Sequence, residues 1–483
     1  MDTTRRGRVR GCPVPAVVAL VVTIVAIGAV RPVGASEPPV EWDTRLVPVV
    51  HEVERIRGLT FEHAVDIEFL SDAAFAQRVG IDRGELTASD EKQMDRSEAM
   101  LRAAGLVAGD VDLVSSLSDL QESGVLAYYE PDTERITVRG KTLDVATRVT
   151  LAHELTHALQ DQHFDLDRIQ RRADRVNGSA AARALIEGDA KRVEIAYLDT
   201  LPGPERDEYV QWQQSAGSRV TETLDAAGVP AALVAVFQSP YSLGQEMLRV
   251  LVAAQDEHAV DALFADPPVS DVSYLDPRTL LADRHVRDVK RPTLGPGERR
   301  LGRRGDVFGA FALYLVLATS GDAVGALRVA DGWGGDALVT FTHDGTTCIR
   351  ANFVGVDAGA SAAIGDALAS WSASRGAGVA EAATMGDVTT LTACDQGSTT
   401  ADPGRTPQAA LVTVLLRNTL LAQGAELVGV DSASCAVDRT LGDASFGPVV
   451  DAAVADPSAP LPDAVSAPFT RAVTAALVEC RTG

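Results

Sequence analysis

Apolar and polar positions follow helical and strand-like periods along most of the chain. The helical period predicts helices at residues 46–56, 71–79, 88–104, 111–120, 143–159, 179–197, 307–317 and 360–374. Alternating or β-rich runs predict strands at residues 63–70, 125–129, 135–138, 337–342 and 348–354. The second and third of these runs flank the turn-prone sequence Glu130-Pro131-Asp132-Thr133-Glu134, so they predict a hairpin. This mixture of helices and strands predicts an α+β fold.

Breaks in these periods predict how the chain is divided. Residues 206–265 are predicted to be mostly helical, with a break at Gln238-Ser239-Pro240. Thr142 is the predicted N-cap of the helix at 143–159, and Trp333-Gly334-Gly335-Asp336 is predicted to be a turn. The Pro- and Gly-rich stretch 291–297 predicts a linker. It separates a domain at 36–290 from a smaller C-terminal α+β domain at 291–483, whose tail is predicted to alternate short strands and helices.

Residues 1–35 have the order of segments found in a secretory signal peptide. Several Arg residues precede an apolar run at 16–30, and Val33-Gly34-Ala35 supplies the small residues of a cleavage site. The alternative is an uncleaved membrane anchor, since residues 14–33 are nearly long enough to span a bilayer. The protein is therefore expected to be secreted or extracytoplasmic, and held at the cell surface if the segment is not cleaved.

Cysteine usage agrees with export. Cys12 would leave with the signal peptide, and the other four, Cys348, Cys394, Cys435 and Cys480, lie in the last third of the chain. An even number of cysteines in an exported chain predicts disulfides. We expect the sequential pairing, Cys348 with Cys394 and Cys435 with Cys480, because each bond then closes one compact segment.

The charge balance narrows the classes of partner. The 483 residues include 44 Lys and Arg against 67 Asp and Glu, a formal net charge of −23. Binding to nucleic acid needs a cationic surface, so this balance argues against a nucleic-acid partner. Beyond the N-terminal segment, no stretch is long and apolar enough to suggest a membrane partner.

The strongest chemical signal is the motif His153-Glu154-Leu155-Thr156-His157, which has the form H-E-x-x-H. On a helix the two His residues lie one turn apart on the same face, so both imidazoles can bind one metal ion. Zinc lowers the pKa of a bound water towards about 7, and Glu154 can then act as the general base that takes its proton. The surrounding positions are Leu, Ala, Val and Thr, which predicts a buried helix rather than a solvated face.

A catalytic zinc site needs a third protein ligand, and two residues are candidates. His163 has the spacing of the metzincin pattern H-E-x-x-H-x-x-G-x-x-H, but Gln160 occupies the position of the required Gly and favours continuation of the helix. Glu187 lies in an otherwise apolar helix, where a carboxylate is costly to bury unless it meets a cation. A helix-surface Glu paired with Lys191 is the simpler interpretation of Glu187, but we favour Glu187 as the ligand.

The sequence HELTHALQDQH at 153–163, followed by ALIEGDA at 184–190, resembles the gluzincin metallopeptidases. The resemblance covers roughly residues 45–200. It implies a zincin-like domain built from a helix, a strand and further helices, a β-hairpin, an active-site helix and a helix that supplies Glu187 as the third zinc ligand. It also implies that an edge strand, here 125–129, holds the substrate as an added β-strand. Later segments look like those of uncharacterised exported actinobacterial proteins of the zinc-protease type.

The resemblance does not fix which residues support the ligand histidines or stabilise the transition state. Many gluzincins have E-x-x-x-D, in which the Asp supports a ligand His, but Lys191 occupies that position here, so Asp189 and Glu194 are candidate substitutes. Zincins usually place a Tyr or His near the developing oxyanion. Tyr241, which follows Pro240 at a predicted helix boundary, is the candidate transition-state stabiliser.

These observations predict an exported zinc metallopeptidase that acts on peptide or protein substrates. His153, His157 and Glu187 would bind Zn²⁺, and Glu154 would be the catalytic base. The alternative is a secreted binding or scaffold protein that retains a structural or degenerate zinc site, although a structural site has no use for Glu154. A third possibility is autoinhibition, in which the C-terminal domain covers the cleft.

Overall fold

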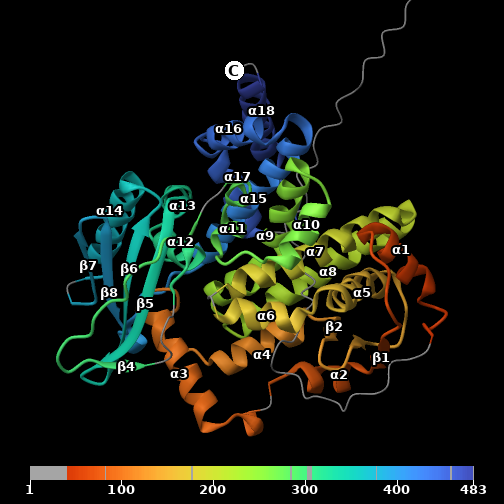
Figure 1. Ribbon diagram of the computed structural model, residues 1–483, viewed down its shortest axis with the longest axis horizontal. Coiled ribbons are helices and arrows are strands. Elements are labelled where there is room, and N and C mark those ends of the chain that lie inside the picture. The colour runs from red at the N-terminus through yellow and green to blue at the C-terminus, as the bar shows by residue number, and fades with distance from the viewer. Residues whose placement is uncertain are drawn as a thin grey trace, which may run out of the picture.

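The computed structural model describes residues 41–481 apart from 82, 176–177, 283–284, 302–306, 377 and 457–458. The predicted signal peptide at 1–35, with Cys12, lies outside the described residues. The described chain is a mixed α+β structure with two small sheets. In Figure 1 the larger sheet lies on one side, a group of long helices lies in the middle, and the last helices lie at the top.

The first sheet has three strands in the order β1-β3-β2. Its region comprises α1 (Val47–Arg57), β1 (Asp66–Leu70), α2 (Asp72–Val79), η1 (Arg83–Glu85), α3 (Ala88–Ala103), α4 (Leu113–Gly124), β2 (Ala127–Glu130) and β3 (Arg135–Arg139). β1 runs parallel to β3, and β2 pairs antiparallel with β3 at the edge of the sheet. The hairpin and the earlier helices agree with the predicted bounds to within about four residues.

Two long helices follow the sheet. They are α5 (Val145–Phe164) and α7 (Ser179–Thr200), joined through α6 (Leu166–Arg175), which the sequence pattern did not predict. The predicted cap Thr142 is wrong, because the N-cap is Asp144, whose carboxylate accepts a hydrogen bond of 2.9 Å from the backbone N–H of Thr147. α5 continues through Gln160, as a good helix former at that position predicts.

The predicted break at Pro240 does not occur. After α8 (Gly203–Ala226), the helix α9 runs without interruption over Ala231–Ala254, with Pro240 inside it. A proline has no N–H to bond the carbonyl four residues earlier, which here belongs to Val236. The Ser239 hydroxyl donates to that carbonyl over 3.0 Å and so replaces the missing bond.

α7 and α9 cross at a pair of glycines. A Cβ on Gly188 would lie 2.3 Å from the backbone carbon of Gly244, and a Cβ on Gly244 would lie 2.1 Å from the carbonyl oxygen of Ala184. Both distances are shorter than any real carbon contact, so only glycine permits this backbone-to-backbone approach. The crossing lies next to Glu187 in the sequence and fixes α9 against that part of α7.

The second sheet has five strands in the order β4-β5-β6-β8-β7. This part of the chain comprises α10 (His258–Ala265), α11 (Val272–Leu275), η2 (Pro277–Leu280), β4 (Arg299–Leu301), α12 (Ala310–Ala318), α13 (Ala323–Asp331), β5 (Trp333–His343), β6 (Thr346–Gly355), α14 (Ala358–Ser374), β7 (Ala380–Met385) and β8 (Val388–Cys394). The predicted turn at 333–336 is wrong, because β5 begins at Trp333. Gly334 and Gly335 allow close approach of the Gly355 and Arg287 carbonyls, where a Cβ would lie 2.5 and 2.4 Å away.

The C-terminal tail is helical. It comprises η3 (Gly397–Thr399), α15 (Thr406–Val428), α16 (Val430–Leu441), α17 (Phe446–Ala455) and α18 (Asp463–Arg481). The expected alternation of strands and helices therefore ends at β8. Disulfides join Cys348 to Cys394 on paired strands β6 and β8, and Cys435 to Cys480 on α16 and α18, which confirms the predicted pairing.

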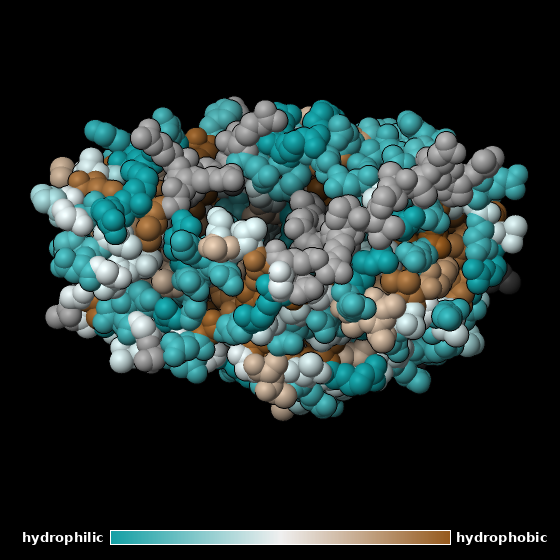
Figure 2. All heavy atoms as spheres, turned by 90° about the horizontal axis from the view of Figure 1, so that it is seen from below, coloured by the Kyte–Doolittle hydropathy of each residue, from teal (hydrophilic) through white to brown (hydrophobic). Residues whose placement is uncertain are grey.

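Buried apolar residues connect the two halves of the chain. One cluster includes residues from Ala103 to Val414 and so spans the predicted linker at 291–297. Among the described helices, α15 alone is long and apolar enough to cross a membrane, yet 67% of its most apolar window is buried inside the protein. Figure 2 shows polar residues over most of the face seen from below, with apolar patches between them.

Candidate metal centre

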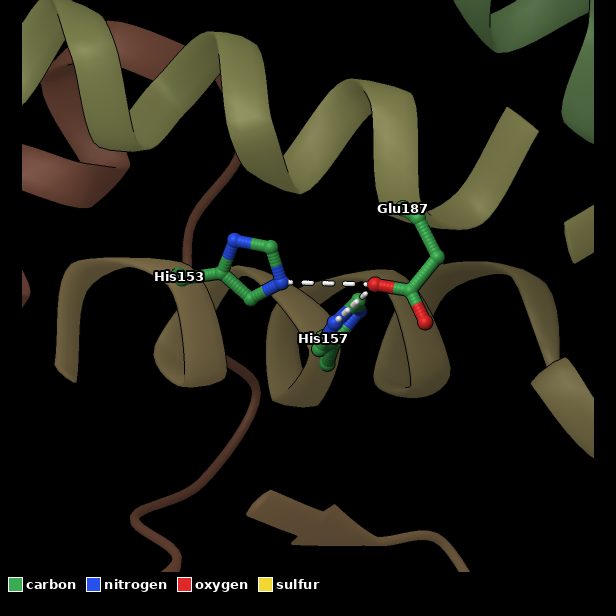
Figure 3. A group of neighbouring side chains, drawn as sticks. All are labelled: His153, His157 and Glu187. Carbon is green, nitrogen blue, oxygen red and sulfur yellow. Dashed lines mark hydrogen bonds and ion pairs between the residues drawn. The ribbon is translucent and has the colours of Figure 1, made fainter. Parts of the chain in front are cut away.

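Two helices bring three ligand side chains together. His153 and His157 lie one turn apart on α5, and Glu187 reaches across from α7 (Figure 3). The Glu187 Oε2 atom lies 3.4 Å from the Nε2 atom of each histidine. All three ligand atoms lie within 4.8 Å of one another, and all three residues are buried. The structure therefore contains a His₂Glu group that could hold a metal ion.

Two of the three ligand-to-ligand distances match those of a tetrahedral zinc site. Zinc binds imidazole nitrogen and carboxylate oxygen at about 2.0–2.2 Å, so neighbouring ligand atoms of a tetrahedron are about 3.4 Å apart. Both nitrogen-to-oxygen distances at Glu187 have this value. Moreover, the Nε2 atom of His157 and the Oε1 atom of Glu187 are buried without a hydrogen-bond partner. Such orphaned polar atoms are costly to bury, and a cation would satisfy them.

The ring of His153 is oriented by a buried carboxylate. Its Nδ1 atom lies 3.1 Å from Glu194 Oε2. Glu194 is itself held by the Lys191 ammonium at 2.6 Å and by the Tyr209 hydroxyl at 3.2 Å. A carboxylate at Nδ1 fixes the proton there and leaves Nε2 free to face the metal. Glu194, one of the two candidate substitutes for the missing Asp, thus contacts a ligand histidine directly.

The ring of His157 is oriented through an amide. Its Nδ1 atom lies 3.0 Å from Gln160 Oε1, and the Gln160 amide donates to Asp189 Oδ2 over 3.0 Å and to the Ile186 carbonyl over 3.1 Å. Arg57 pairs with the same Asp189 oxygen at 2.8 Å. Sequence reasoning used Gln160 only to exclude a helix break and missed this role. The signal was available, because positions three apart on a helix face the same side.

The charges of the group are balanced even without a cation. Burial disfavours a charged imidazole, but hydrogen bonds to Glu187 and Glu194 outweigh it and raise the pKa of His153 to about 9. Burial also disfavours the charged form of Glu187, but the two histidines outweigh it and lower the pKa of Glu187 to about 2. A metal ion would take the place of the His153 proton.

Glu154 is a buried carboxylate whose oxygens lack a close hydrogen-bond partner. The residue is 0% exposed, and neither carboxylate oxygen has a partner within hydrogen-bond distance and angle. Burial raises the pKa of Glu154 to about 8, and the charge of His153 and the backbone N–H of Tyr129 offset this only in part. A group whose pKa lies near neutrality can both take up and release a proton at physiological pH, which is the property required of a general base.

Tyr241 lies beside the metal group, although it is in the middle of a helix rather than at a boundary. Its hydroxyl accepts a hydrogen bond of 3.2 Å from Arg183 Nη2, and Arg183 Nε lies 3.8 Å from Glu187 Oε1. Burial, together with the charge of Glu187, raises the pKa of Tyr241 well above its ordinary value, so the phenol keeps its proton. The competing ligand candidate His163 lies elsewhere, with its Nε2 atom 2.8 Å from the carbonyl oxygen of Thr60.

The metal group is closed to solvent. The side chains of His153, His157 and Glu187 are 0–1% exposed. A small aromatic cluster that includes Phe75 of α2, Tyr128 of β2 and Tyr241 of α9 joins the edge strand to the helix beside the metal group. A large substrate would therefore reach the group only after some of the surrounding side chains move.

Similarity to characterised proteins does not add to this description. No protein-family model, curated protein or solved structure matches the chain. Function is therefore inferred from the chemistry of the site, namely a His₂Glu group, a buried carboxylate with a raised pKa, and a protonated phenol.

Proposed function

We propose that the protein is an exported zinc metallopeptidase of the gluzincin type. The observation that supports this most directly is Glu154, a buried carboxylate without a close hydrogen-bond partner, next to a group with the ligand spacing of zinc. The two disulfides are compatible with an extracytoplasmic location, where such bonds persist.

Each polar residue then has a defined task. His153, His157 and Glu187 hold the ion, which when bound supplies Lewis-acid polarisation of water and of the scissile carbonyl. Glu154 takes the proton of the attacking water and later delivers it to the leaving amine. The phenol of Tyr241 donates a hydrogen bond to the oxygen on which negative charge develops.

The position of β2 is compatible with a peptide as the substrate. β2 is an edge strand, and it packs against the helix that bears the H-E-x-x-H motif. All four residues of β2 are buried, so an extended peptide would add to this edge through backbone hydrogen bonds only after the side chains that cover it move. The order of hairpin, motif helix and Glu helix is the order expected of a zincin-like domain.

A secreted binding or scaffold protein with a structural zinc site is the alternative, and the complete burial of the metal group favours it. Structural sites are usually closed by a fourth protein ligand, however, and the group within the described residues has three. A buried carboxylate without a close partner also costs stability without adding a ligand. Glu154 therefore favours the catalytic proposal.

The experiment is a comparison of Glu154→Gln with the surface control Glu205→Gln, both as mature full-length protein. Glu154→Gln should keep wild-type zinc content and fold, and its rate of peptide-library hydrolysis should fall by about 10²–10⁴ or more, the contribution of general base catalysis. Glu205→Gln should match the wild type, and a chelator should abolish activity until zinc is restored. Wild-type protein that binds zinc yet cleaves nothing, or Glu154→Gln that cleaves at the wild-type rate, would contradict the proposal.

A further inference from the structure

Arg183 is more exposed than the other polar side chains described around the metal group. Its side chain is 34% exposed, whereas that of Lys191 is 18% exposed and that of Glu187 is 0% exposed. Arg183 precedes Glu187 by one helical turn on α7, so its guanidinium lies on the same face as the ligand. It therefore marks the side from which a solvated molecule can approach the site.

The guanidinium is held in place with most of its donors unused. It lies over the rings of Tyr241 and Phe237, 5.7 and 6.0 Å from their centroids, which fixes its plane. The described structure gives it one hydrogen bond, to Tyr241, and an ion pair of 3.8 Å with Glu187. An arginine has five N–H donors in a planar fork that matches the two oxygens of a carboxylate.

The ion pairs around Arg183 leave a place for an anionic group. Lys191 pairs with Glu194, and Arg57 and Arg192 are shared among Asp189, Asp261 and Glu257. Arg183 has only the Glu187 oxygen at 3.8 Å as an ion-pair partner among the described residues, and a bound metal ion would engage Glu187. A substrate carboxylate would give Arg183 a close anionic partner, whereas a neutral peptide would leave its charge partly desolvated.

We propose that Arg183 is a specificity residue that binds a carboxylate of the substrate, so the site prefers peptides with a carboxylate near the scissile bond. This rests on the proposed function. The carboxylate has two sources, the C-terminus of a peptide or the side chain of Asp or Glu, and both offer the same bidentate partner. Arg183 contacts substrate directly, in contrast to a role restricted to orienting Tyr241.

Binding measurements test this independently of hydrolysis. The zinc-loaded Glu154→Gln protein is titrated calorimetrically with three peptides of the same length, namely acetyl-Ala-Phe-Ala-Ala as the amide, the same peptide with a free C-terminus, and acetyl-Ala-Phe-Asp-Ala as the amide. The titrations are repeated with Arg183→Met added, with Arg183→Lys added, and with the control Arg148→Met added. Arg148 is similarly exposed, at 28%, and pairs with Glu205 away from the metal group.

At least one carboxylate peptide should bind about 10- to 100-fold more tightly than the neutral amide, the range expected of a charge-assisted hydrogen bond. Arg183→Met should remove that preference, Arg183→Lys should keep part of it, and Arg148→Met should keep all of it. A preference for the free C-terminus assigns the main-chain carboxylate, and a preference for Asp assigns the side chain.

Any of three results would overturn the assignment. The first is equal affinity for all three peptides, and the second is a preference for a carboxylate peptide that survives Arg183→Met. The third is an equal loss of affinity for all three peptides in both Arg183 variants, which would mean that Arg183 only positions Tyr241. If Arg183→Met does not fold, as judged by zinc content and circular dichroism, Arg183→Lys is compared with Arg148→Met. A reduced preference for carboxylate peptides in Arg183→Lys alone would still support the assignment, and an unchanged preference would contradict it. Absence of hydrolysis by the wild type would contradict the peptidase proposal but leave the measured affinities intact.

Discussion

Replacement of Glu187 by alanine tests the ligand set directly. The Glu187 oxygen lies 3.4 Å from both histidine nitrogens, so its loss leaves two imidazoles of one helix to hold the ion. Structural zinc sites with four ligands bind with about 10–16 kcal/mol, or roughly 2.5–4 kcal/mol for each ligand. Zinc affinity should therefore fall by about 10²–10³-fold. With zinc in excess, the metal-dependent part of the unfolding free energy should fall by the same roughly 2.5–4 kcal/mol.

The assay is zinc competition with a chromogenic chelator, combined with denaturant unfolding of each variant with and without metal. The difference between the two unfolding curves removes any effect of the substitution on the metal-free protein. His163→Ala is the matched control, because His163 is exposed and contacts only the Thr60 carbonyl among the described polar groups. If Glu187→Ala retains one tightly bound zinc while His163→Ala loses it, both the ligand assignment and the gluzincin proposal are wrong.

Three further substitutions test the residues around the site and in the core. Glu194→Gln should weaken zinc binding by about 10–100-fold without loss of fold, since it removes the charge behind His153 Nδ1; competition titration measures this. Gly188→Ala should lower the unfolding free energy by about 3 kcal/mol or more in denaturant titrations, because its Cβ would lie 2.3 Å from the Gly244 backbone. Burial raises the pKa of Glu246 from 4.5 to about 7, so the folded state binds more protons than the unfolded state between these pH values. The unfolding free energy should therefore fall by roughly 3 kcal/mol as pH rises from about 4.5 to 7, and Glu246→Gln should flatten that dependence.

The metal ligands could be predicted from sequence because their signals are local. Two histidines four residues apart share a helix face whatever the rest of the fold does. Glu187 could be singled out because a carboxylate in an apolar helix needs a cation, and the structure brings it, rather than His163, to the two histidines. The disulfide pairing was also predictable, since sequential pairs close short segments.

The residues that support these ligands could be predicted only in part. Glu194 was a sequence candidate for the support of a ligand histidine, and Gln160 shares a helix face with His157. The onward path from Gln160 through Asp189 to Arg57 joins α5, α7 and α1, and no local period specifies it. Pro240 has the sequence signal of a helix break, but the neighbouring Ser239 hydroxyl replaces the missing hydrogen bond. Here a side-chain hydrogen bond, rather than backbone propensity, decides the local structure.

The glycine crossing explains why the metal ligand and the phenol occupy one site although they are far apart in sequence. Gly188 follows Glu187 directly, and Gly244 lies three residues, less than one helical turn, after Tyr241. Contact between the two glycines therefore sets the distance between ligand and phenol, and Arg183 lies one turn before Glu187 on α7. A larger residue at either glycine would separate the helices, and Glu187 and Arg183, both on α7, would then lose the phenol on α9. The same backbone contact that stabilises the core thus determines the chemistry available beside the metal group.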